Sequence, residues 1–366
     1  MARAVSPPFQ PNRPTAGRGR GARSNQTGRY EKETREDFDD GWSDEPPEEH
    51  KTEIIFDRTR RIINYISSPY VPMDRSINPY RGCEHGCIYC FARPSHAYLG
   101  MSPGLDFETR ILVKPEAAPL LRRELSSRHY NPHAIALGTN TDPYQPAERK
   151  LRIMRQILEV LAEFNHPVTI LTKSDLITRD IDILAPMAEK GLARAMISVT
   201  TMDPKLARTM EPRVPRPDKR FAAMKALAEA GIPTGTMQGP MIPGLSDHEL
   251  EGLMEHAAEQ GASYAAYTLL RLPLEVAPLF KEWLETFCPD RAPRVLNLMK
   301  AINGGKLYDV NWSRGDGPRH EINQLLARRF QKACRKLGFT TPPPMRIDRF
   351  RVPVKPNAQG DLFGKG

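Results

Sequence analysis

Short apolar runs alternate with longer segments of helical period along the chain from about residue 51. A short strand is expected just before Cys83, and apolar runs of strand length follow at 133–139, 167–173, 194–201, 233–239 and 263–270. Between these runs, apolar side chains recur at helical spacing, first at Leu151, Met154, Ile157, Leu158 and Leu161, and then within 175–190, 217–230 and 246–260. This β-α alternation, repeated about six times, predicts a parallel sheet with right-handed crossovers.

The ends of the predicted helices carry capping residues. Asp175 and Ser246 are expected N-caps, and Gly191, Gly231 and Gly261 are expected to end helices. About six β-α units suit either a partial barrel or a doubly wound sheet, and the spacing alone does not choose between them. In both arrangements the functional loops follow the C-terminal ends of the strands.

The two ends of the chain differ from this central pattern. The first fifty residues are rich in Pro, Gly, Arg and then acidic side chains, which predicts disorder. After residue 275 the pattern is mostly helical, with one apolar face at Ile322, Leu325, Leu326, Phe330, Cys334 and Leu337. We therefore predict a disordered charged tail at 1–50, a core at 51–275, a helical extension at 276–345 and a flexible tail at 346–366.

Charge is distributed unevenly along the 366 residues, which carry a net charge of +9. Residues 1–30 are basic and residues 31–50 are strongly acidic, so the overall surplus belongs to the body of the chain. A basic body permits an anionic partner such as nucleic acid. The stretch RGRGAR at 18–23 could touch RNA or DNA, although a solvated tail is the simpler interpretation.

The lengths of the apolar runs and the number of cysteines indicate the cellular compartment of the protein. No run approaches the ~18 consecutive apolar residues of a membrane span, and the N-terminus has no hydrophobic stretch of the signal type. The five cysteines are odd in number and three are clustered, which does not indicate a disulfide framework. We therefore expect a cytoplasmic protein with no membrane partner.

Three of the cysteines lie in the stretch NPYRGCEHGCIYCFARP, with the spacing Cys83-x3-Cys87-x2-Cys90. A structural zinc site needs four ligands, and the next cysteine lies far along the chain. His85 or His96 could complete a Cys3His zinc site, although His85 lies between the cysteines. A [4Fe–4S] cluster with three thiolate ligands and one open iron fits the spacing better, because an open coordination position is where a metal performs chemistry.

This spacing, with the aromatic residue Tyr89 directly before the third cysteine, is the signature of the radical S-adenosylmethionine (radical SAM) superfamily. The chain is identified as a member, and the resemblance implies that Cys83, Cys87 and Cys90 bind the cluster while S-adenosylmethionine occupies the open iron. It further implies that an electron from the cluster splits the sulfonium bond, and that a 5′-deoxyadenosyl radical abstracts hydrogen from a substrate. Flavodoxin or ferredoxin is the implied electron donor, nucleic acid is a candidate substrate, and the bond attacked is not identified.

Other stretches over roughly residues 60–340 resemble the spore photoproduct lyase-like (DNA repair photolyase-like) branch of that superfamily. They are GTNTDPYQPAE (138–148), TKS (172–174), SVTTMDPKLARTMEPR (198–213) and PMIPGLSD (240–247). The resemblance implies that residues 51–275 form a partial (β/α)6 TIM-like barrel, an α/β fold with a mostly helical C-terminal extension.

Five residues are candidate contacts of S-adenosylmethionine. Thr141 follows one predicted strand, and Lys173 closes the next, where it could pair with the cofactor's carboxylate. Ser198 and Thr200 share one face of a strand, and Tyr89 lies within the cysteine loop. The lyase relatives have a hydroxyl and a lysine at the spacing of Thr141 and Lys173. For Glu211 and Arg213, an internal salt bridge is an equally good explanation.

Two departures from the lyase pattern bear on the substrate. The lyase has a cysteine at the end of its second strand that returns hydrogen to the product radical, and Thr139 occupies that position here. The lyase also has a tyrosine directly after the third cysteine, where this chain has Phe91. An O–H is a far poorer hydrogen donor than a thiol, so these departures disfavour repair of spore photoproduct.

Two other classes of function remain open at this stage. One is a non-enzymatic iron–sulfur protein that senses redox state or carries electrons, and the other is a zinc-stabilised nucleic-acid-binding module. The C-terminal stretch QGDLF, Gln359–Phe363, resembles the peptide by which bacterial proteins bind the sliding clamp. A sliding clamp is therefore a candidate partner.

Overall fold

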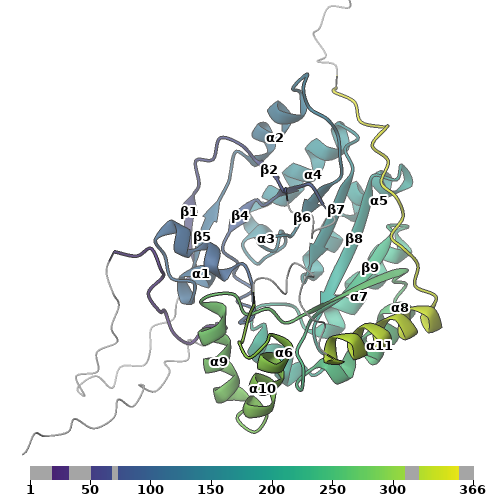
Figure 1. The fold of residues 1–366 in the computed structure, drawn as a ribbon. Helices are drawn as coiled ribbons and strands as arrows, with labels where there is room; N and C mark the ends of the chain where they lie inside the picture. Colours follow the sequence, from purple (N-terminus) through teal and green to yellow (C-terminus); the bar gives the residue numbers. More distant parts are fainter. Residues whose placement is uncertain (1–18, 33–50, 68–72, 310–320, 354–366) are drawn as a thin grey trace, which may run out of the picture.

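The computed structural model describes residues 19–32, 51–67, 73–309 and 321–353 (Figure 1). Its main sheet has seven strands in the order β10-β9-β8-β7-β6-β3-β2. They are β2 (Ile63–Tyr65), β3 (Arg75–Ile77), β6 (Ile135–Leu137), β7 (Val168–Thr172), β8 (Ala193–Val199), β9 (Thr234–Met241) and β10 (Tyr264–Leu269). All neighbours are parallel except the edge pair β2 and β3.

The strand order decides between the two folds that the sequence left open. From β3 to β10 the parallel strands follow one another across the sheet in chain order. A doubly wound sheet would instead reverse its winding at a switch point. One-directional winding is that of a partial barrel, so the α/β class and the parallel sheet are confirmed.

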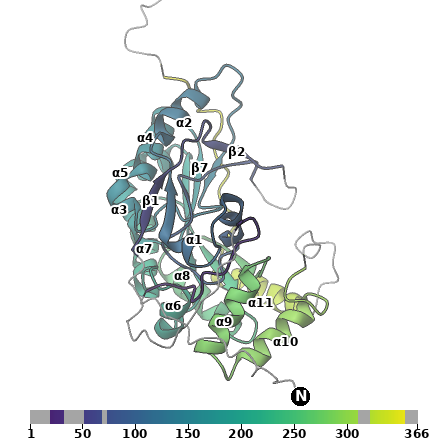
Figure 2. The ribbon, with the colours of Figure 1, turned by 90° about the vertical axis from the view of Figure 1, so that its left-hand side faces the viewer.

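Helices cover the outer side of this sheet. Figure 2 shows α2, α4 and α5 along one side of the strands. The helices of this region are α2 (Ala117–Leu125), α3 (Glu148–Leu151), α4 (Ile153–Glu163), α5 (Ile181–Glu189), α6 (Pro204–Met210), α7 (Pro217–Glu229) and α8 (Leu250–Glu259). Their apolar faces bury Ile157, Leu161 and Met224 against sheet residues such as Ile170 and Ile197, which forms the main core.

The helical extension has two parts. Helices α9 (Val276–Phe287) and α10 (Ala292–Ile302) bury Trp283 and Val295 in a second core, which also contains Ile88 and Tyr89 from the cysteine loop. Helix α11 (Glu321–Leu337) packs against α8, where Arg329 pairs with Glu251. No helix within the described ranges is long and apolar enough to cross a membrane.

A second sheet was not predicted from the sequence. It joins β1 (Glu53–Phe56), β5 (Arg110–Val113) and β4 (Tyr80–Arg81) in the order β1-β5-β4, next to the short helix α1 (Leu105–Thr109). Strand β5 pairs in parallel with β1 and antiparallel with β4. Because β4 ends at Arg81, this sheet fixes the point from which the cysteine loop departs.

Several predicted local features need correction. Ser174, and not Asp175, caps its helical segment, because the Ser174 hydroxyl accepts from the Leu176 amide at 3.3 Å. Ser246 does occupy the predicted N-cap position, before the short 3-10 helix Asp247–Glu249, but its hydroxyl accepts from the Ile242 amide and makes no cap bond. Leu325, placed on the apolar face of the last helix, is 51% exposed, whereas Leu326 is buried.

The glycine stops behave as expected. Gly191, Gly231 and Gly261 have φ values of 69°, 74° and 85°, which lie in the left-handed region that favours glycine. Cys288 follows α9 as its C-cap. Cys334 packs against the main core from α11.

The predicted tails are corrected where the structure describes them. Residues 19–32 fall in the predicted disordered tail, yet they are docked on the body and Ala22 is fully buried. Residues 346–353 fall in the predicted flexible tail, yet the Arg346 amide donates to the Gly191 carbonyl at 2.9 Å. The rest of both tails, including Gln359–Phe363, lies outside the described residues.

The docked C-terminal segment is held by an aromatic cluster. Phe350 contacts the rings of Tyr130, Phe164 and His166, with centroids 5.6, 6.2 and 5.6 Å away. The Arg351 amide donates to the Phe164 carbonyl at 3.0 Å. This segment therefore closes the end of the sheet beside α5, as the yellow trace in Figure 1 shows.

Phe350→Ala is expected to lower the free energy of unfolding by about 1–3 kcal/mol, because the partly buried ring loses its contacts with three aromatic neighbours. Urea unfolding followed by circular dichroism measures the change. Val352→Ala, at an exposed position on the same segment, is the control and should shift the midpoint little. Equal effects of both substitutions would contradict a specific role for the aromatic cluster.

Candidate cofactor-binding site at the cysteine loop

The cysteine loop runs from Gly82 to Ala92 and has no regular secondary structure, so its peptide groups need partners from elsewhere. The Cys83 amide donates to the Phe107 carbonyl at 2.9 Å, and the Ile88 amide donates to the Met210 carbonyl at 3.0 Å. Gly82 has a φ of 83°, and a Cβ there would lie 2.8 Å from the Phe107 carbonyl oxygen. The loop is thus fixed between α1 and the end of α6.

Arg93 holds two carbonyls of the loop. Its side chain is fully buried and donates to the carbonyls of Cys87 at 3.0 Å and Gly86 at 3.1 Å. It also donates to the carbonyls of Pro103 and Gly104. Its charge is balanced by the buried carboxylate of Glu108, 2.5 Å away.

The three thiols are buried close to one another. Burial, together with the negative charge of Asp142, raises the pKa of Cys83 well above its usual range. Burial also raises the pKa of Cys87 and of Cys90, although the positive charge of Lys173 acts in the opposite direction on both. Such thiols stay protonated in the free chain and become thiolates only when iron or another cation balances their charge.

The donor set fits a cluster better than a single ion. Within the described residues, no group of three or more His, Cys, Asp and Glu side chains converges closely enough to hold one metal ion. His85 faces Asp142, with Nδ1 3.4 Å from Oδ2, and His96 Nε2 lies 3.0 Å from the Arg110 carbonyl oxygen. Neither histidine completes the thiol set, so the three thiols of the loop are the candidate ligands at this place.

A buried polar network adjoins the loop at the C-terminal ends of β7, β8 and β9. Lys173 Nζ donates to Ser198 Oγ at 2.7 Å and to the Gly239 carbonyl at 3.2 Å. The Thr200 hydroxyl donates to the same carbonyl at 3.0 Å and lies 3.1 Å from the Tyr89 hydroxyl. Four of the five predicted contact residues, Tyr89, Lys173, Ser198 and Thr200, are therefore brought together.

Glu211 lies at the centre of this network. Its carboxylate pairs with Arg220, lies 3.4 Å from Lys173 Nζ and accepts hydrogen bonds from Tyr89 and Thr200. Burial by itself raises the pKa of the Glu211 carboxyl. The positive charges of Arg220 and Lys173 outweigh this effect and lower the pKa to about 2. Because two cations face one carboxylate, these three side chains carry one net positive charge.

Thr141, the fifth predicted contact, is hydrogen-bonded to the start of the loop. Its hydroxyl donates to the Gly82 carbonyl at 2.7 Å and accepts from Gln145 at 3.1 Å. Gln145 Oε1 also accepts from the Glu84 amide at 2.9 Å. In this structure, Thr141 and Gln145 hold the backbone of the cysteine loop.

Two residues of the site, Arg220 and Asp142, were not among the five predicted contact residues. Arg220 is fully buried on α7, yet in the sequence it is one basic residue among several in a helical segment. Asp142 accepts from the Thr172 hydroxyl at 2.6 Å and from the Lys173 amide at 2.8 Å, which positions Lys173. The order GTNTDP offered a signal for Asp142, because that aspartate follows a strand end next to Thr141.

The two positions that depart from the lyase pattern are also placed. Thr139 follows β6, and its hydroxyl donates to Asn78 Oδ1 at 3.2 Å. Phe91 is 59% exposed directly after the third cysteine. Neither side chain supplies a thiol or a phenol.

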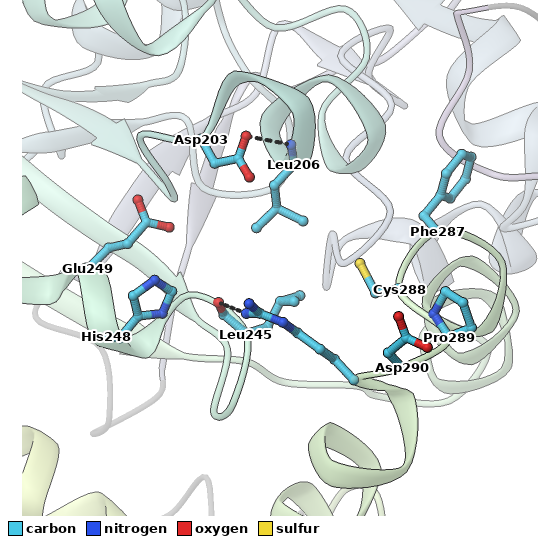
Figure 3. Close-up of a pocket in the computed structure, with 10 residues that line it drawn as sticks. Asp203, Leu206, Leu245, His248, Glu249, Phe287, Cys288, Pro289 and Asp290 are labelled. Carbon is cyan, nitrogen blue, oxygen red and sulfur yellow. Dashed lines mark hydrogen bonds between the residues drawn. The ribbon is translucent and has the colours of Figure 1, made fainter.

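A surface pocket of about 520 Å³ lies outside this site, between α6, the segment 245–249 and the turn from α9 to α10 (Figure 3). It is lined by Asp203, Leu206, Leu245, His248, Glu249, Phe287, Cys288, Pro289, Asp290 and Arg291. Asp203 and Glu249 already accept hydrogen bonds from backbone amides, of Lys205 and Met202 respectively. None of the predicted site residues faces this pocket, so we do not place the cofactor there.

Comparisons with known proteins agree with this geometry. The family model described as the Radical SAM superfamily matches residues 77–257. An uncharacterized protein of Mycobacterium tuberculosis is 37% identical over 287 residues, which cover 78% of this chain and 82% of that protein. A radical SAM Nalpha-GlyT isomerase of Pseudomonas phage M6 is 23% identical over 266 residues, which cover 72% of this chain and 52% of that protein.

A solved structure extends the comparison to the fold. A spore photoproduct lyase mutant with bound AdoMet and dinucleoside spore photoproduct matches with a TM-score of 0.55 and 16% identity, covering 80% of this chain and 82% of that chain. At this identity the likeness is one of fold.

Replacing Cys83, Cys87 or Cys90 by Ala should abolish iron binding while the chain still folds, because the loop contributes little to the main core. Iron and sulfide content after anaerobic reconstitution measures the effect, with circular dichroism as the check on folding. Cys288→Ala and Cys334→Ala, outside the loop, should keep wild-type iron content. Full iron content in any of the three loop variants would contradict this assignment.

Proposed function

The chain belongs to the radical SAM superfamily and is a radical SAM enzyme, and on that premise we propose that Cys83, Cys87 and Cys90 hold a [4Fe–4S] cluster. The observation that carries the proposal is the position of the Lys173 ammonium beside this loop, 5.6 Å from the centre of the Tyr89 ring. A cation at the C-terminal ends of parallel strands, next to three buried thiols, is placed for an anionic cofactor group.

The cluster and S-adenosylmethionine supply the radical chemistry when bound, because splitting the sulfonium bond takes an electron that side chains do not provide. The chain's own residues bind and orient. We propose that Lys173 pairs with the carboxylate of S-adenosylmethionine, supported by the net positive charge of the Lys173, Arg220 and Glu211 group. Glu211 keeps Lys173 in place without neutralising it, because Arg220 balances the same carboxylate.

Neutral groups of the site limit where the cofactor can lie. Ser198 and Thr200 both donate to the Gly239 carbonyl, so β8 and β9 present a rigid polar edge to the loop. The buried Tyr89 hydroxyl lies beside Thr200 and Glu211, which fixes the side chain that precedes Cys90. The Glu211 and Arg220 side chains are buried, whereas the Lys173 side chain is 15% exposed, so Lys173 is the cation of this network that a cofactor can reach.

The substrate class that we propose is nucleic acid, with a flavodoxin or ferredoxin as the electron donor. The support is the fold shared with a lyase whose solved structure contains a dinucleoside lesion, together with the basic body of the chain. Thr139 and Phe91 provide neither of the hydrogen donors that the lyase pattern contains. The proposed reaction is therefore hydrogen abstraction from a nucleic acid, and the outcome of that reaction is not the repair of spore photoproduct.

The reconstituted, reduced chain should convert S-adenosylmethionine to 5′-deoxyadenosine, and the Cys87→Ala variant should not. The same anaerobic incubation with dinucleoside spore photoproduct should release no thymidine, because the hydrogen donors are missing. Chromatography of the nucleosides measures both products. Iron uptake without 5′-deoxyadenosine would contradict the proposed chemistry, and multiple turnovers to thymidine would contradict the proposed exclusion of repair.

Lys173→Ala should weaken binding of S-adenosylmethionine about tenfold to a hundredfold, the range expected for the loss of a charge-assisted hydrogen bond, while iron content stays unchanged. An anaerobic binding titration measures the dissociation constant. Lys190→Ala is the matched control, because that lysine contacts Asn165 away from the site. Unchanged affinity in Lys173→Ala would reassign this lysine to a structural role beside Glu211.

A further inference from the structure

The segment Arg20–Arg29, which we call the strap, crosses the cysteine loop from the outside. The backbone amides of Gly21 and Ala22 donate to the two carboxylate oxygens of Glu108, at 2.8 and 2.7 Å. The Ala22 side chain is 1% exposed and belongs to the second core, together with Cys87, Ile88 and Tyr89. The strap therefore completes the surroundings of the loop that carries the thiols.

Glu108 connects the strap to the loop. This fully buried carboxylate accepts from Arg93, whose guanidinium holds the carbonyls of Gly86 and Cys87. Without the strap amides, the carboxylate would lose two of its buried donors, and an unsatisfied buried charge is costly. The strap thus stabilises the loop through Glu108 and Arg93.

The approach of the strap to the loop is too close for any side chain at Gly21. A Cβ at this position would lie 1.8 Å from the Gly86 carbonyl oxygen and 3.3 Å from Glu108 Oε1. Gly21 does not have a left-handed φ, so alanine would meet only a steric conflict there. The contact is therefore with the backbone of the cysteine loop itself, between Cys83 and Cys87.

The outer part of the strap is fastened to other elements. The Ser24 hydroxyl donates to Glu282 on α9 at 2.8 Å, and Arg29 pairs with Glu275 at 2.5 Å. Asn25 exchanges hydrogen bonds with Asp106 on α1. Arg20 donates to the Glu108 carbonyl and to Thr52, so this arginine is committed to the body of the protein and not to nucleic acid.

We propose that the strap and Glu108 position the cysteine loop for cluster binding, so that the segment predicted as a disordered tail is part of the cofactor site. This inference rests on the proposed function in one respect, which is that the loop holds a cluster. The contact between the strap and the cysteine loop covers the thiols whether or not iron is bound, so it can be tested on the chain without iron.

The first measurement is the rate at which iodoacetamide alkylates each cysteine in the full-length chain without iron, under anaerobic reducing conditions and resolved by mass spectrometry. Gly21→Ala should speed alkylation of Cys87 about tenfold or more. The added methyl group displaces the strap, so the buried Glu108 carboxylate loses two amide donors, and the loss of a hydrogen bond to a buried charge corresponds to a factor of about this size. Cys334, packed far from the loop on α11, is the internal reference. Gly252→Ala, where an added Cβ meets nothing within 4 Å, is the matched control.

A double-mutant cycle tests whether the strap acts through Glu108. Glu108→Gln should also speed alkylation of Cys87, and the combination with Gly21→Ala should add little to the larger single effect, because both break the same contact. Unchanged alkylation of Cys87 in a folded Gly21→Ala chain would overturn the proposal, as would equal acceleration at Cys334. Additive effects of the two substitutions would overturn the role given to Glu108.

The second measurement separates this inference from the proposed function. After reconstitution, iron loss to a chelator should be about tenfold faster from Gly21→Ala than from the wild type or Gly252→Ala. A wild-type chain that takes up no iron would contradict the proposed function, while the alkylation rates would still decide the strap contact. Equal iron loss from a Gly21→Ala chain whose thiols are more exposed would overturn the positioning role.

Discussion

The site depends on satisfying a buried segment of irregular backbone. The three thiols lie on a loop that has neither helix nor strand bonds, so its carbonyls require other donors. Arg93 supplies the carbonyls of Gly86 and Cys87 from one rigid guanidinium, and Glu108 balances the buried charge of that guanidinium. An ion pair with no exposure is weak evidence for stability in general, but here it sets the shape of the backbone between Cys83 and Cys90.

A buried carboxylate also organises the polar network beside the loop. Lys173 and Arg220 share the carboxylate of Glu211, and the hydroxyls of Ser198 and Thr200 turn towards the Gly239 carbonyl. The strands β7, β8 and β9 are parallel neighbours, so their C-terminal residues meet at one edge of the sheet, beside the loop. The fold therefore brings charge and thiols together, and the local bonds keep the charge from being cancelled.

The sequence was most informative where side-chain burial is periodic. The runs at 167–173 and 194–201 contain β7 and nearly all of β8 because alternate residues there face a core. Strand β1 was missed because its four residues are mostly exposed and show little periodicity. Arg220 was missed because only its environment, and not its place on a helix, makes it part of the site. The strap was mistaken for disorder because it docks through backbone amides at Gly21 and Ala22, which composition does not record.

The order in which the chain is made gives the strap a further consequence. Its residues leave the ribosome before the partners Glu108 and Glu282, which are synthesised 87 and 258 residues after Gly21 and Ser24. The amides of Gly21 and Ala22 can dock over the cysteine loop once α1 exists, whereas Ser24 finds its partner only when α9 exists. The strap is therefore fastened in two steps, first beside the thiols and later against the helical extension.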